Sequence, residues 1–166
     1  VFVEGRIDED YFSALKEHYP AVYSLPADVE VISYGGKDAL KNTQMLQFVN
    51  SMLERAFFTY DLDAHSQLKK RFESMGLVEG KDFLPIGVKK AGRDCIEGLL
   101  PERIKAKVYA RMTDRVDALG STVSDERRKA KDELKKAYLE EFAKGNSSEE
   151  ELKPFMTLLA KLSKAF

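Results

Sequence analysis

Val1-Phe2-Val3-Glu4-Gly5 opens the chain, and Ala56-Phe57-Phe58-Thr59-Tyr60-Asp61-Leu62-Asp63 repeats its pattern, a short apolar run that ends in acidic residues. Runs of β-branched and aromatic residues of this length are typical of buried β-strands. Two more runs of the same kind lie at residues 29–34 and 83–86. The sequence therefore predicts four short strands.

Helices are expected between these strands, because apolar residues recur there at helical spacing. Helices of this length that join strands make right-handed crossovers onto a mainly parallel sheet. After Pro101 the chain changes to long charged segments with an apolar stripe. We expect an α/β fold over residues 1–100, with a small Rossmann-like sheet flanked by helices, and a C-terminal helical extension over residues 101–166. The predicted helices are 8–19, 38–55, 66–75, 102–119, 124–144 and 148–166.

The composition limits the class of protein. The chain has 166 residues, of which 43% are hydrophobic and 33% charged, so it can bury a core and is neither disordered nor a disulfide scaffold. Its single cysteine, Cys95, cannot form an internal disulfide and indicates a reducing, cytoplasmic location. No apolar run reaches the roughly 18–20 residues of a membrane span. The chain lacks an initiator methionine, and we expect it to be part of a longer protein.

Acidic residues follow the predicted strands. Glu4 closes the first strand and Asp8 lies one helical turn later; Asp61 and Asp63 close the third strand, and Glu97 follows the fourth. Ligands of parallel sheets bind at the carboxyl ends of the strands. If the first and third strands are neighbours, their acids converge there. Carboxylate oxygens suit a hard divalent cation, and two such ions can support hydrolysis of a phosphodiester.

Each of these residues also has a plainer interpretation. An acid after a strand is commonly a solvated turn residue, and an Asp-x-Asp is commonly a turn or a helix cap. Gly35-Gly36-Lys37 fits either a phosphate-binding loop or a turn that needs positive φ. His65 could bind a metal ion or a phosphate, but its sequence position favours an ordinary surface residue. Cys95 is best explained as a small core residue. The joint placement of the acids at strand ends favours the metal site.

The residues described so far resemble a Toprim domain, the metal-binding fold of topoisomerases, bacterial primases and several nucleases. Its signature is an apolar strand ending in Glu-Gly, here Val3-Glu4-Gly5, followed by a strand ending in Asp-x-Asp, here Asp61-Leu62-Asp63. Within that group the chain is most similar to the C-terminal region of OLD-family (overcoming lysogenisation defect) nucleases. Glu4-Gly5-Arg6-Ile7-Asp8, Gly35-Gly36-Lys37 and Ile96-Glu97-Gly98-Leu99-Leu100-Pro101 carry this resemblance, which spans roughly residues 1–100.

The resemblance implies an endonuclease that cleaves DNA with two divalent ions, Mg²⁺ in the first place, with Mn²⁺ or Ca²⁺ able to substitute or assist. By this carry-over Asp8, Asp61 and Asp63 hold one ion. Glu4 bridges the ions or acts as the base, and Glu97 helps to hold the second ion. These assignments are expectations from the family.

The family also uses a lysine from its later helical part to stabilise the transition state. Lys135 is the preferred residue here, with Lys136 and Lys144 behind it. The family further implies an ABC-type ATPase domain that precedes this region in the full-length protein. Residues 1–166 contain no Gly-x-x-x-x-Gly-Lys loop that would bind ATP.

Charge and apolar patterns bear on partners. The chain has 27 Lys and Arg against 28 Asp and Glu, a near-neutral balance that alone argues against DNA as a ligand. However, residues 99–136 are locally basic, which suits either a DNA backbone or an ordinary solvated surface. The apolar stripe of residues 152–162 fits a core face first and a homodimer contact second.

Two other functions remain open at this stage. A receiver-like signalling module would bind Mg²⁺ beside Asp61 and accept a phosphoryl group on that residue. Such a module does not require the Asp-x-Asp or Glu97. A non-catalytic interaction domain with the same fold is the third interpretation.

Overall fold

Four parallel strands form one sheet in the order β2-β1-β3-β4. They are β1 (Phe2–Val3), β2 (Ile32–Ser33), β3 (Phe58–Asp61) and β4 (Phe83–Ile86). The structure is a computed structural model that describes residues 1–36, 39–41, 46–47, 51–52 and 55–166. All three strand pairs are parallel, and the first strand lies between the second and the third. The sequence prediction of an α/β fold with a small parallel sheet is therefore confirmed.

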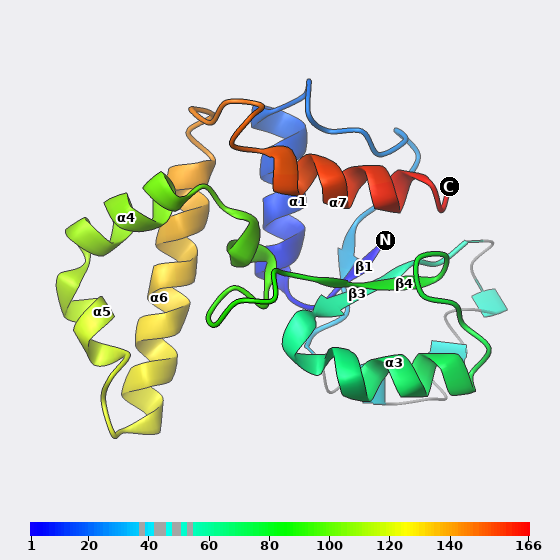
Figure 1. Cartoon of the computed structure of the whole chain (residues 1–166), viewed down its shortest axis with the longest axis horizontal. Helices are drawn as coiled ribbons and strands as arrows, with labels where there is room; N and C mark the ends of the chain where they lie inside the picture. The colour runs from blue at the N-terminus through cyan, green and yellow to red at the C-terminus, as the bar shows by residue number, and fades with distance from the viewer. Residues whose placement is uncertain (37–38, 42–45, 48–50, 53–54) are drawn as a thin grey trace.

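Helices cover both faces of this sheet (Figure 1). Helix α3 lies on one face and helices α1 and α7 lie on the other, while α4, α5 and α6 stand together beyond one end of the strands. The helices are α1 (Arg6–His18), α3 (His65–Ser74), α4 (Glu102–Arg111), α5 (Thr113–Ala118), α6 (Ser124–Phe142) and α7 (Lys153–Ser163). Three short 3₁₀ helices complete the described elements: η1 (Ala39–Lys41), η2 (Leu62–Ala64) and η3 (Ile96–Leu99).

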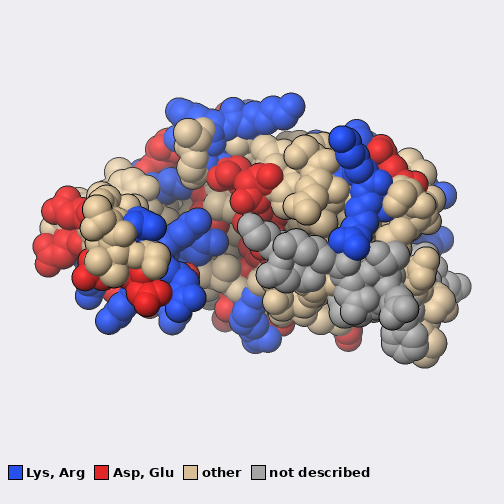
Figure 2. Space-filling model, turned by 90° about the horizontal axis from the view of Figure 1, so that it is seen from below, with Lys and Arg blue, Asp and Glu red and all other residues tan. Residues whose placement is uncertain are grey.

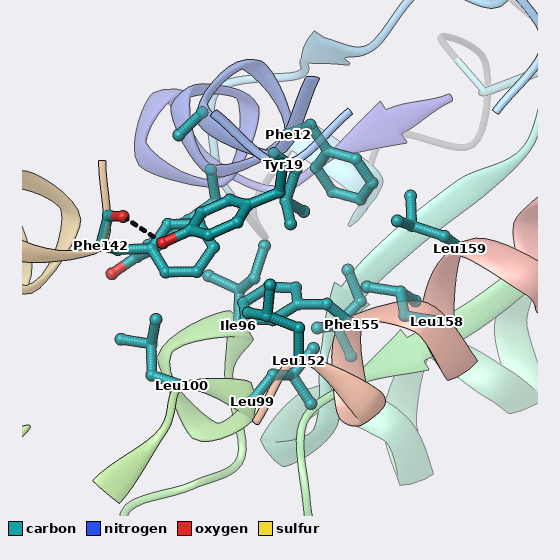
Figure 3. Close-up of a cluster of buried hydrophobic side chains, with 14 of the residues drawn as sticks. Phe12, Tyr19, Ile96, Leu99, Leu100, Phe142, Leu152, Phe155, Leu158 and Leu159 are labelled. Carbon is teal, nitrogen blue, oxygen red and sulfur yellow. Dashed lines mark hydrogen bonds between the residues drawn. The ribbon is translucent and has the colours of Figure 1, made fainter. Parts of the chain in front are cut away.

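The larger part of the core lies between α1, α6, α7 and the sheet. Tyr11, Phe142 and Phe155 are fully buried there, with ring centroids 5.2–6.4 Å apart. The hydroxyl of Tyr19 donates a hydrogen bond to the carbonyl oxygen of Phe142 at 2.7 Å, which ties α1 to the end of α6 (Figure 3). The α7 stripe is buried in this core, so the first interpretation of the stripe, a core face, is confirmed.

A second group of buried side chains fills the space between the sheet and α3. Phe58, Tyr60 and Phe83 project from β3 and β4 onto Phe72 of α3, with ring centroids 4.7–6.2 Å apart. Phe57, just before β3, packs in the larger core, and Thr59 is fully buried, so both faces of β3 are covered.

Two predicted helices differ from the structure. Residues 102–119 form two helices, because the chain leaves helical geometry at Met112 (φ −124°, ψ 45°). This bend lets Met112 and Val116 pack against the core, which is a tertiary effect that helical periodicity does not report. The predicted helix 38–55 lies largely outside the described residues.

The last helix begins at Lys153 rather than at residue 148. Ser148 and Glu151 nevertheless form a capping box, since the Glu151 carboxylate accepts from the Ser148 N–H at 3.0 Å and the Glu151 N–H donates to Ser148 Oγ at 3.4 Å. It closes a separate turn. Pro154 has no N–H to donate to a preceding carbonyl oxygen, so it is tolerated in the first turn of α7 but not inside one continuous helix.

The division at residues 100 and 101 stays a prediction, and α6 and α7 share one core with α1. Among the described residues no helix is long and apolar enough to cross a membrane. Figure 2 shows carboxylates gathered near the middle of one face, with lysine and arginine side chains interspersed with further carboxylates on the part formed by α4, α5 and α6.

Candidate metal centre

The acids that follow β1 and β3 meet at one edge of the sheet. These two strands are direct neighbours, with Phe2 in register with Phe58. The backbone N–H of Asp61 donates to Oε2 of Glu4 at 3.3 Å. The convergence of Glu4 and Asp61 that the sequence predicted is therefore present in the structure.

Asp8 reaches the same edge from the first turn of α1. Gly5 is the N-cap of this helix, and its N–H donates to Oδ2 of Asp8 at 2.7 Å. This is one half of a capping box; glycine has no side chain to return the bond. The bond holds the Asp8 carboxyl beside the end of β1, although the residue is only 7% exposed.

Burial and mutual repulsion raise the pKa values of these carboxyls. The pKa of Asp61 is raised from its ordinary value of 3.8 to about 8, first by burial and then by the charges of Glu4 and Asp8. The pKa of Asp8 is raised from 3.8 to about 6, mainly by burial, with Glu97 and Glu4 adding to it. The Gly5 hydrogen bond partly opposes this shift. Asp61 therefore keeps its proton at neutral pH, and Asp8 loses its proton at a higher pH than an isolated carboxyl does.

Glu97 of η3 is the most enclosed acid of the group, at 4% exposure. Neither of its carboxylate oxygens has a hydrogen-bond partner in the described part of the chain. Lys135 of α6 brings its Nζ to 3.1 Å from Oε1, an ion pair that lacks hydrogen-bond geometry. Burial lowers the pKa of Lys135, but the attraction of Glu97 outweighs it and the net shift is upward. We call Glu4, Asp8, Asp61 and Glu97 the acidic edge.

The backbone around Glu97 depends on a close approach that only glycine allows. A Cβ added to Gly98 would lie 2.1 Å from the carbonyl oxygen of Arg93. At Gly87, where φ is +128°, it would lie 2.5 Å from the carbonyl carbon of Asp94. Gly87 and Gly98 therefore fold the connection after β4 tightly enough to place Glu97 at the acidic edge.

Two further polar groups lie near Glu97. The Tyr11 hydroxyl is buried and has no hydrogen-bond partner among the described residues. Its pKa is raised by burial and then by the charge of Glu97. Burial and Glu97 also raise the pKa of the Cys95 thiol to about 12, so this thiol is uncharged at neutral pH. From the sequence, the helical spacing of Tyr11 with Phe12 and Leu15 predicts only a core position for it.

Asp63 is the predicted ligand that the structure places apart. The strand ends at Asp61 and η2 begins at Leu62, so the strand alternation that would put Asp63 on the same side as Asp61 is lost. Its side chain is exposed and lines a hollow of about 380 Å³ together with Lys89 and Lys90.

The other residues singled out in the sequence are also located. His65 stacks on Tyr60 and its Nδ1 lies 3.1 Å from the Tyr60 hydroxyl, which is a packing role. Lys136 is exposed, and Lys144 pairs with Glu141 at 2.5 Å near the end of α6. Of the three lysines considered for the site, Lys135 is the one at the acidic edge.

The loop after β2 adjoins Glu4. Gly35 and Gly36 have φ values of +85° and +103°, as a turn that requires glycine would have, and the Gly36 N–H donates to the carbonyl oxygen of Glu4 at 2.7 Å. The turn interpretation is confirmed. A phosphate-binding role of the loop stays a prediction, and Lys37 lies outside the described residues.

Within the described ranges no three His, Cys, Asp or Glu side chains are arranged closely enough to hold one metal ion. Binding an ion in common would require the carboxylates of the acidic edge to rotate toward one another. A hollow of about 480 Å³ lies at the opposite edge of the sheet, where Val1 and Glu30 line it. No protein-family model, curated protein or solved structure matches the chain.

Proposed function

We propose that the chain is a divalent-metal-dependent DNA endonuclease of Toprim fold, the catalytic region of a larger OLD-family ATPase–nuclease. The observation that carries the proposal is the Glu97 carboxylate. It is almost fully buried, and its charge acts on Asp8 and Asp61. Its ion-pair partner among the described residues is Lys135, and neither oxygen accepts a hydrogen bond from a described group. A buried group of carboxylates that outnumbers its cationic partners is costly unless a further cation binds there.

The acidic edge suits Mg²⁺ by its chemistry. All four side chains offer carboxylate oxygens, which hard divalent cations prefer, and Mg²⁺ commonly needs only one or two of them because it retains water. Glu4 and Asp61 are joined through the Asp61 N–H, and the pKa of Asp61 is raised by its acidic neighbours. A bound cation would relieve this repulsion. Glu4, Asp8 and Asp61 would hold one ion and Glu97 would help to hold a second.

Glu4 and Lys135 are assigned separate roles in the proposed reaction. Bound ions would act as Lewis acids on the scissile phosphate and activate water for attack. Glu4 has a carboxylate oxygen free of the Asp61 bond and is the residue we assign as proton acceptor. Lys135 carries a positive charge beside Glu97, where it offsets negative charge that builds up on the phosphate.

The charge distribution supports DNA as the substrate. The net charge of −1 is the sum of two unlike regions, the acidic edge and a helical part that contains many lysines and arginines. Bound cations would offset the charge of the acidic edge. We expect this locally basic surface alone to bind a DNA backbone weakly. The proposal therefore includes a partner ATPase domain that strengthens DNA binding. It also includes a cytoplasmic location, which the single cysteine favours.

Nicking of supercoiled plasmid tests the proposal. Wild type is incubated with Mg²⁺, Mn²⁺ or Ca²⁺, beside Glu4→Ala and Asp61→Ala, and with Asp28→Ala as a matched control. Asp28 is an exposed acid at the opposite edge of the sheet. We expect metal-dependent nicking by wild type and Asp28→Ala and its loss in the other two variants. The absence of cutting with every metal, together with labelling of Asp61 by acetyl phosphate, would instead establish the receiver-like function.

A further inference from the structure

Lys105 is a buried lysine that has no hydrogen-bond or ion-pair partner among the described residues. It projects from the inward face of α4 between Ile104 and Val108, and only 8% of it is exposed. In the described part of the chain Lys105 makes no hydrogen bond and no ion pair. Its Nζ is nevertheless not among the polar atoms that are sealed from solvent, so an incoming group can reach it.

Contacts around Arg93 place Lys105 near Glu97. Lys105 lies three residues after Glu102 on α4. The backbone of Arg93 packs against Gly98, the residue that follows Glu97. Glu102 pairs with Arg93 of the loop after β4. Glu97 pairs with Lys135 at 3.1 Å. Each of these carboxylates already has a cationic partner, and neither forms an ion pair with Lys105 among the described residues.

Burial, and then repulsion by Arg93, lowers the pKa of Lys105. A buried ammonium without a counter-ion is unfavourable, and an arriving anion would restore the balance.

We propose that Lys105 binds a non-bridging oxygen of a DNA phosphate that lies at the acidic edge next to Glu97. This inference rests on the proposed function, because DNA is the substrate that supplies the anion. Lys105 thus joins Lys135 as a second lysine on the side of the site formed by α4 and α6. Sequence analysis counted it only among the basic residues of a mixed-charge segment.

The test measures affinity for a fluorescent DNA duplex in EDTA over a series of KCl concentrations. Lys105→Met removes the charge and keeps the apolar stem, Lys105→Arg keeps the charge, and Lys161→Met is the matched control. Lys161 is an exposed lysine of α7. Each phosphate contact makes the plot of log affinity against log salt concentration steeper by about 0.9. Losing one contact therefore lowers the ratio of the affinity at ~0.1 M salt to the affinity at ~1 M salt about eightfold. We expect this loss in Lys105→Met only.

An unchanged slope in Lys105→Met, or no duplex binding by wild type, overturns the inference. Cleavage of the same duplex by wild type in Mg²⁺ is measured in parallel and judges the nuclease separately. A reduced slope without cleavage supports the phosphate contact and contradicts the nuclease. Thermal unfolding verifies that Lys105→Met is folded; if it is not, Lys105→Gln takes its place, with the same two outcomes.

Discussion

Replacing Asp61 by asparagine should stabilise the metal-free protein at alkaline pH. The carboxyl of Asp61 is held at the acidic edge with its pKa raised from 3.8 to about 8, by burial and then by Glu4 and Asp8. Ionisation of this carboxyl is less favourable in the folded protein than in the unfolded chain, so it lowers the free energy of unfolding. Asparagine keeps the shape and the N–H that bonds to Glu4, and it cannot ionise.

The magnitude follows from the linkage between protonation and folding. Between the unfolded pKa of 3.8 and the folded pKa of about 8, the folded protein retains a proton that the unfolded chain has lost. The free energy of unfolding therefore falls as pH rises, by about 1.4 kcal/mol per pH unit. From about pH 5 to about pH 8 the upper limit is about 4 kcal/mol, and partial contact with solvent reduces it to about 2 kcal/mol.

Urea denaturation in EDTA, followed by circular dichroism at several pH values, measures this effect. Wild type should lose about 2 kcal/mol between about pH 5 and about pH 8, while Asp61→Asn should change much less over this window and be the more stable protein at its upper end. Asp28→Asn, at an exposed acid, should follow wild type. An Asp61→Asn variant that is less stable than wild type at about pH 8, or that shows the wild-type pH dependence, refutes the reasoning.

Three further predictions concern the support of the site. Lys135→Met should destabilise the protein at neutral pH by about 3 kcal/mol, because it leaves Glu97 buried without a cation, and adding Glu97→Gln should restore most of the loss. Phe155→Ala should cost about 3–5 kcal/mol, because Phe155 is fully buried in the core. Gly98→Ala should weaken both stability and metal binding, since its Cβ would meet the Arg93 carbonyl, whereas Gly120→Ala should be tolerated.

Chemical denaturation and metal titration check these three predictions. A Lys135→Met protein as stable as wild type would show that Glu97 is not buried as a charge. Met156, which is 36% exposed on the same helix as Phe155, is the control for the core, and a loss at Met156→Ala equal to that at Phe155→Ala would contradict the packing described. A Gly98→Ala variant with full stability and metal binding would contradict the close approach to Arg93.

The positions of the strand-end acids could be predicted from the sequence. An apolar run ending in an acid locates a strand end, and the rule that parallel strands present their carboxyl ends at one edge brings Glu4 and Asp61 together. Both steps depend on local pattern and chain order. Asp63 does not follow the rule because the 3₁₀ turn that begins at Leu62 ends the alternation of the strand.

Features that depend on docking between distant elements could not be predicted. The break at Met112 and the pairing of Lys135 with Glu97 both arise from how α4, α5 and α6 pack together. One feature of the sequence indicates that Lys105 faces inward: it lies next to Ile104 and three residues before Val108, both of which are apolar. Helical spacing alone would have placed it on the inward face, but the surrounding mixed charges resemble an ordinary solvated surface.

The central claim is that the acidic edge binds divalent ions, and electron paramagnetic resonance of Mn²⁺ tests it most directly. Free Mn²⁺ gives a strong signal that weakens when the ion is bound, so a titration counts the ions held by each chain. The account predicts that wild type binds up to about two ions and that Asp61→Asn and Glu97→Gln each bind fewer, with Asp28→Asn unchanged. Wild type that binds no Mn²⁺, or variants that all bind it equally, would contradict the account.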